Sequence, residues 1–110
     1  MAHTGATVTL GAHTGTGAAT AVSLGQTQDL NLSTVYVYGT FVGTVSIEVS
    51  PDGTNYTIAT TPAGAPITAT APGTYVIAGD ATHVRSNCTA YTSGTINVKM
   101  IYGSGIGKVP

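Results

Sequence analysis

Residues 41–57 have the sequence FVGTVSIEVSPDGTNYT, which predicts a β-hairpin. Along 45–50 apolar and polar residues alternate, as they do in a strand that buries one face. A second strand is predicted at 55–60. Between the two, the Pro-Asp-Gly run at 51–53 supplies a fixed φ, a side chain that bonds within its own turn, and a residue that tolerates positive φ. This part of the chain is therefore expected to be antiparallel β-structure.

Strand signals also recur outside the hairpin, whereas no window combines helical spacing of apolar residues with a helix cap. A chain of 110 residues has the length of one domain. Short strands separated by Gly, Pro, Asn or Asp predict an all-β, single-domain antiparallel β-sandwich that is jelly-roll-like. We expect a flexible Gly/Thr/Ala-rich N-terminal arm at 1–17 and the β-sandwich domain at 18–110. The expected strands lie at about 6–10, 18–24, 34–38, 43–50, 55–60, 66–70, 74–78, 82–91 and 94–102.

The composition excludes several classes of partner. Charged residues make up 6% of the chain and the net charge is −1, so copies repel one another weakly and self-association is expected. Three basic residues, Arg85, Lys99 and Lys108, are too few for a nucleic-acid interface. No apolar run has the length of a membrane span, and the first residues do not form a secretory leader, so we expect no membrane partner.

Catalysis and metal binding have weak support in the sequence. The three histidines, His3, His13 and His83, stand in no catalytic motif, and we expect neither an enzyme nor a cofactor. His3 and His13 share the context AHTG, which by itself makes a poor metal site. Cys88 is the only cysteine, so the chain has no internal disulfide. Its alternation with Val84 and Ser86 predicts a small core residue and not a reactive thiol.

Two groups of residues are candidates for contact with a partner or another copy. In STVYVYG the alternation puts Tyr36 and Tyr38 on one face, which is expected either to lie under a loop or to meet a partner. The repeated AHTG of the N-terminal arm gives the second group: His3, Thr4, His13 and Thr14. A frayed terminus followed by an edge strand explains that arm equally well.

Arg85 and three further tyrosines leave alternatives open. Arg85 can hold a turn, pair with Asp80 or bind a partner. The tyrosines near turns can stack on sugar rings in a β-sandwich, although the chain has no tryptophan, which is the preferred stacking residue. These tyrosines are Tyr56, Tyr75 and Tyr91.

Two segments resemble small structural proteins of tailed bacteriophages. GTFVGTVSIEVSPDGTNYT, at 39–57, resembles a strand-turn-strand element of these proteins, and THVRSNCTAYTSGTINVKM, at 82–100, resembles their C-terminal element. The two segments occur in the expected order. Tyr56 and His83 depart from the pattern, which often has Trp and Tyr at these positions.

The resemblance indicates a virion protein of the capsid decoration or cement type. It implies a compact sandwich or jelly roll, commonly a homotrimer, made in the cytoplasm of a bacterial host and located on the capsid surface. Its partner would be the major capsid protein, whose mature lattice it would stabilise. The alternative is a receptor- or glycan-binding module of a phage tail or fibre, and an internal or connector component of the virion or a cellular adhesion-like domain also remains open.

Overall fold

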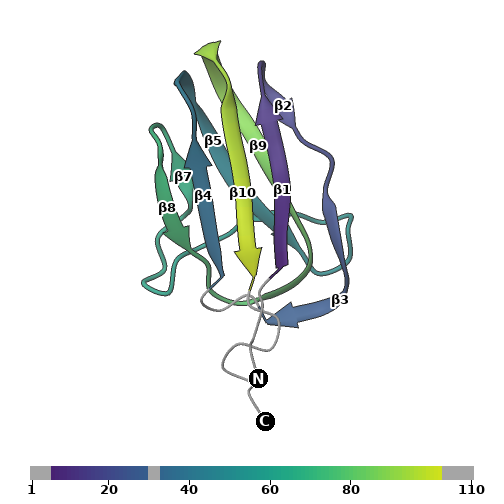
Figure 1. Cartoon of the computed structure of the whole chain (residues 1–110). Helices are drawn as coiled ribbons and strands as arrows, with labels where there is room; N and C mark the ends of the chain where they lie inside the picture. Colours follow the sequence, from purple (N-terminus) through teal and green to yellow (C-terminus); the bar gives the residue numbers. More distant parts are fainter. Residues whose placement is uncertain (1–5, 30–32, 103–110) are drawn as a thin grey trace.

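The computed structural model describes residues 6–29 and 33–102, which form two antiparallel sheets packed face to face (Figure 1). In this part of the chain one sheet has four strands in the order β1-β10-β4-β8, and the other has six, with the path β2-β9-β5-β6 and with β3 and β7 paired to β9 and β5. The predicted all-β sandwich is confirmed. The strands are β1 (Ala6–His13), β2 (Gly17–Ala18), β3 (Val22–Asp29), β4 (Thr34–Tyr38), β5 (Phe41–Ser50), β6 (Thr57–Ile58), β7 (Thr68–Ala69), β8 (Gly73–Val76), β9 (Asp80–Gly94) and β10 (Ile96–Tyr102).

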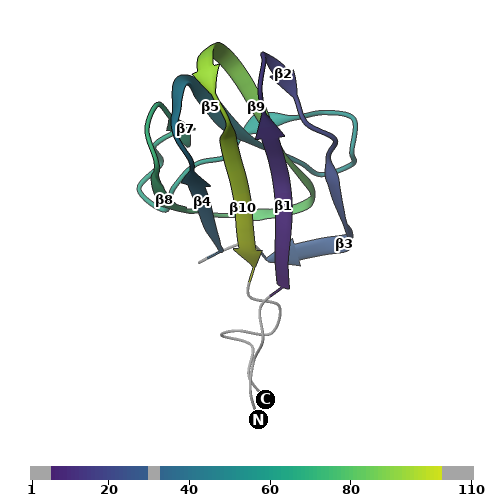
Figure 2. The same ribbon diagram turned by 45° about the horizontal axis from the view of Figure 1, so that its top comes forward.

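The order of the strands is that of a jelly roll. The two-residue β2 and the eight-residue β3 share one edge of the six-stranded sheet, and the two-residue strands β6 and β7 share the other. β5 and β6 are joined by a hairpin within the same sheet, and every remaining connection passes from one sheet to the other. The first described strand, β1, lies beside the last, β10 (Figure 2). Such crossing connections distinguish a jelly roll from a simple meander.

The core fills the space between the sheets and follows from the alternation in the sequence. Val45 and Ile47 of β5 belong to the same core cluster as Val98 and Met100 of β10, and all four are fully buried. Because each side chain in a strand points opposite to the next, the intervening residues face outward. Further buried apolar side chains are Leu10, Leu24, Val35, Val37, Ile67, Ile77, Val84, Cys88 and Ile96.

The hairpin of β5 and β6 exists, but its loop is longer than the sequence suggested. β5 ends at Ser50 and β6 begins at Thr57. The Asp52 carboxylate accepts hydrogen bonds from the backbone N–H groups of Thr54 and Asn55, both at 2.9 Å, and from the Asn55 side chain at 2.8 Å. These bonds hold residues that were expected to begin the second strand within the loop.

The segment expected to be a flexible N-terminal arm, 1–17, forms a β-strand over most of its described residues. Residues Ala6–His13 form β1 and pair with β10 from Ala6↔Tyr102 to His13↔Ile96. The physical reason is the alternation of Val8 and Leu10 with threonines, which buries Leu10 to 1% exposure. The sandwich therefore includes β1, and the boundary expected at residue 17 is wrong for 6–13. Residues 1–5 lie outside the described part of the chain.

Candidate functional site

The outer face of the four-stranded sheet carries both tyrosines of STVYVYG. Tyr36 and Tyr38 of β4 are 40% and 41% exposed, whereas the alternating residues Val35 and Val37 of the same strand are buried. Among the described residues, no loop covers the two tyrosine rings enough to bury them. Residues that pair directly across antiparallel strands share a face, so the strand registers define this surface, called the tyrosine face below. Its members are Thr7, Thr9, Thr34, Tyr36, Tyr38, Thr74, Val76, Asn97, Lys99 and Ile101.

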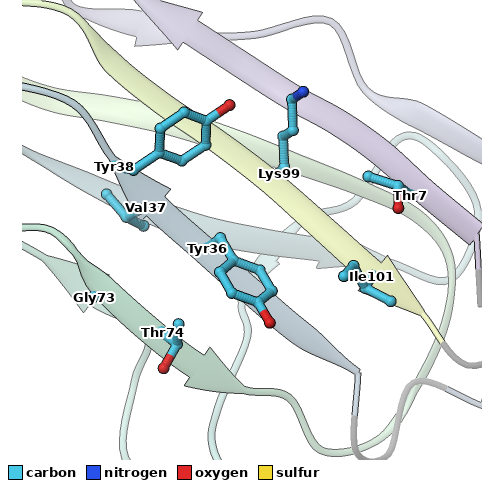
Figure 3. A pocket seen from close by; sticks show the side chains of 8 residues that line it. All are labelled: Thr7, Tyr36, Val37, Tyr38, Gly73, Thr74, Lys99 and Ile101. Carbon is cyan, nitrogen blue, oxygen red and sulfur yellow. The ribbon is translucent and has the colours of Figure 1, made fainter.

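A groove of about 420 Å³ crosses the tyrosine face, and all four strands contribute to it. Gly73 lies on the β8 side of the groove, in register with Val37 of β4. Figure 3 shows both tyrosine rings and the Lys99 side chain rising from the neighbouring strands β4 and β10. The lining residues are Thr7, Tyr36, Val37, Tyr38, Gly73, Thr74, Lys99 and Ile101.

Lys99 is the only charged residue that lines this groove. It pairs in register with Thr9 of β1 on one side and with Tyr36 of β4 on the other, so it stands near the middle of the sheet. Within 6–29 and 33–102 it has no ion-pair partner. The tyrosine face is thus a mostly apolar and hydroxyl-bearing surface with one uncompensated positive charge.

Arg85 lies on the other side of the molecule, in a compact polar cluster on β9 and β5. Its Nε donates to Glu48 Oε1 at 2.6 Å, and its guanidinium lies 3.8 Å from the centroid of the Tyr56 ring. Asn87 donates to the second carboxylate oxygen of Glu48 at 3.2 Å. The partner of Arg85 is therefore Glu48 and not Asp80. This arrangement satisfies the guanidinium within the chain, and Arg85 does not join the tyrosine face.

His13 is buried between the two sheets. It ends β1, is 7% exposed, and its Nε2 lies 2.7 Å from the Ser86 hydroxyl of β9, which in turn donates to the backbone carbonyl of Leu10 at 2.8 Å. Burial lowers the pKa of His13 below its ordinary value. The prediction that His13 contacts a partner is wrong for this fold, because the ring is enclosed by its own chain.

Of the other residues of the predicted N-terminal contact group, the structure describes Thr14. Thr14 is exposed just after β1. His3 and Thr4 lie outside the described residues. Of all the predicted contact residues, the structure brings together Tyr36 and Tyr38.

The three tyrosines considered for sugar stacking are occupied by internal contacts. Tyr56 lies under the Arg85 guanidinium. Tyr75 and Tyr91 are partly buried and pack against the core, and the Tyr91 hydroxyl also donates to the Gly94 carbonyl at 2.7 Å. Tyr36 and Tyr38 are the more exposed aromatic rings.

The groups that could support covalent or metal chemistry are dispersed. Cys88 is 1% exposed, as expected for a core residue. Ser86 and His13 are in hydrogen-bond contact, yet Ser86 is fully buried and gives its proton to Leu10, so this pair is structural. Among the described residues, no group of three or more His, Cys, Asp or Glu side chains could hold a metal ion. The same part of the chain contains no helix long and apolar enough to cross a membrane.

Sequence reasoning did not place Lys99, Thr74 or Gly73 with the tyrosines. The alternation in TINVKMIY does put Lys99 and Ile101 on the outer side of their strand, and the structure confirms that Ile96, Val98 and Met100 are buried. The missing information was that β10 and β8 flank β4, with Lys99 opposite Tyr36 and Thr74 on the far side. That register joins segments far apart in the chain and leaves no local signal.

Comparison of the chain with protein-family models, with curated proteins and with solved structures finds no match.

Proposed function

We propose that this protein is a non-enzymatic virion component that binds the outer surface of a mature bacteriophage capsid and stabilises it. The partner is the major capsid protein, and the tyrosine face is the docking surface. Copies of the chain associate with one another, as a homotrimer in the form that the resemblance of 39–57 and 82–100 implies. The protein is made in the bacterial cytoplasm and ends on the capsid surface.

The observation that carries this proposal is the exposure of two adjacent tyrosines on a regular sheet face. Tyr combines a large rigid contact area with a polar tip and is enriched where proteins meet. A β-sheet holds the backbone of such side chains in a fixed position, which reduces the ordering cost at binding. The low charge of the chain and the resemblance to phage structural proteins favour a protein lattice as the surface that is bound.

The proposed mechanism requires only differential binding. A protein that binds the mature lattice and not its precursor shifts the equilibrium toward the mature form by mass action. Each bound copy adds a small stabilisation, and many copies on one shell add up. No covalent step takes part.

The test is sedimentation of the purified protein with phage particles from which it has been stripped. We expect binding that saturates at a fixed ratio to the major capsid protein, and a loss of about tenfold or more in affinity for the double variant Tyr36→Ser/Tyr38→Ser, since aromatic anchors dominate such contacts. Ile58→Ser is the matched control, because Ile58 is 45% exposed on the other sheet.

Two outcomes would contradict the proposal. Binding to purified glycans or host cells, with only a few copies on each particle, would favour a module of a tail or fibre. Equal losses in the tyrosine variant and the Ile58 control would show that docking uses another surface.

A further inference from the structure

Lys99 gives the groove of the tyrosine face a chemical preference. The described part of the chain contains two Lys or Arg residues, and Arg85 is already paired with Glu48. Lys99 has no carboxylate partner there. The carboxylates with described side chains are Glu48 on β5, Asp52 in the loop after β5 and Asp80 at the start of β9, and none of these belongs to the tyrosine face.

A partner that covers the groove also covers Lys99. The ammonium group rises between Tyr38 and Thr7 in Figure 3, within the lining of the groove. A charge that loses water without gaining a counter-charge costs free energy, and the cost is larger when the surroundings are apolar. A neutral partner would therefore be disfavoured, and one that presents a carboxylate to Lys99 would be selected.

We infer that the groove binds a segment of a protein partner in which one Asp or Glu, flanked by apolar side chains, pairs with Lys99. One cation matches one carboxylate, whereas a polyphosphate or a sulfated glycan would require several cations. Tyr36, Tyr38 and Ile101 provide apolar contact for the flanking side chains. The other polar side-chain groups of the lining are the hydroxyls of Thr7, Tyr36, Tyr38 and Thr74. Lys99 is the one charged side chain of the lining and sets the electrostatic preference of the groove.

This inference deepens the proposed function, on which it rests for the identity of the partner, but its chemistry can be tested separately. A displayed library of random peptides is selected on the immobilised protein, and the enriched peptides are synthesised. We expect enrichment of a single Asp or Glu with apolar neighbours. Replacement of that acid by its amide, or Lys99→Gln in the protein, should each weaken binding about tenfold, and Lys99→Arg should retain most of it.

A control variant with the same net charge as Lys99→Gln separates the specific role of Lys99 from a general effect of net charge. Thr57→Glu changes the net charge of the protein by the same amount as Lys99→Gln, at an exposed position of β6 on the other sheet, and should leave the affinity unchanged. Selected peptides without an acid, selection that yields no peptides for the groove, or equal effects of Thr57→Glu and Lys99→Gln would overturn the inference. If the protein enriches acidic peptides but does not bind phage particles in the sedimentation test, the inference about the groove holds. The proposed function is then rejected.

Discussion

His13 is a titratable side chain placed where only its neutral form fits well. Ser86 has one hydroxyl proton, and the 2.8 Å contact with the Leu10 carbonyl uses it. The Ser86 oxygen then accepts from His13 Nε2, which assigns the proton of the neutral ring to Nε2. The contact connects β1 of one sheet with β9 of the other.

This geometry predicts that stability decreases in mild acid. Burial lowers the folded-state pKa of His13 from the ordinary value of 6.5. Because the pKa of His13 is lower in the folded than in the unfolded protein, His13 contributes to stability above its unfolded-state pKa. This contribution to stability is lost as the pH falls through the folded-state pKa. Urea unfolding between about pH 7.5 and about pH 5 should therefore show a decreasing free energy of unfolding.

His13→Gln is the corresponding variant, because a glutamine amide can donate to Ser86 and does not titrate. Its free energy of unfolding should depend less on pH over the same range than that of the natural protein. An unchanged pH dependence in His13→Gln would show that another group is responsible.

Single residues also show where sequence reasoning ends. Val45 and Ile47 were predicted to share the buried face of β5, and they do. Ser46, on the opposite face, is 4% exposed, because Thr68 of β7 and Asn87 of β9 pair with it on either side, and the Ser46 and Thr68 hydroxyl oxygens lie 3.3 Å apart. The burial of His13 depends in the same way on Ser86, which is 73 residues away. Alternation indicates which way a side chain points, but not what a distant segment places over it.

Among the elements, the connection from β9 to β10 depends on one glycine. Gly94 has a φ of 86°, and a Cβ at this position would overlap the Thr40 carbonyl oxygen just before β5. The same carbonyl accepts a hydrogen bond from the Thr95 backbone at 3.2 Å. The turn thus joins the ends of β9 and β10 to the start of β5.

Gly94→Ala should destabilise the protein by about 1–3 kcal/mol, because the alanine would be strained and would displace Thr40. Gly15→Ala is the matched control: its Cβ would meet nothing within 4 Å and its φ is not positive. The control should stay within about 0.5 kcal/mol of the natural protein. Thermal unfolding of both variants checks this, and equal midpoints would contradict the role given to the turn.

The long strands were easier to predict than the short ones. β4 and β10 bury alternate residues, so their positions follow from period-two alternation. In β5 the alternating Val45 and Ile47 are buried as well. The segment expected at 18–24 is divided into β2 and β3, and β6 and β7 have two residues each. These edge strands exist because the long strands provide partners for them, which the local sequence does not encode.

For the molecule as a whole, the two outer sheet faces differ in how their charges are satisfied. On the six-stranded sheet Arg85, Glu48, Tyr56 and Asn87 contact one another. On the four-stranded sheet Lys99 has no ion-pair partner among the described residues and lies beside the exposed tyrosines of β4. The charges of the first face are paired within the chain, whereas Lys99 on the second face would gain a counter-charge from a binding partner.

The most direct test of this account is a cryo-electron microscopy reconstruction of phage particles bearing the protein, at a resolution that shows its strands. We predict that β1, β10, β4 and β8 face the major capsid protein, with a carboxylate of that protein beside Lys99. A reconstruction in which these strands face solvent, while another surface holds the protein on the shell, would contradict the docking role of the tyrosine face.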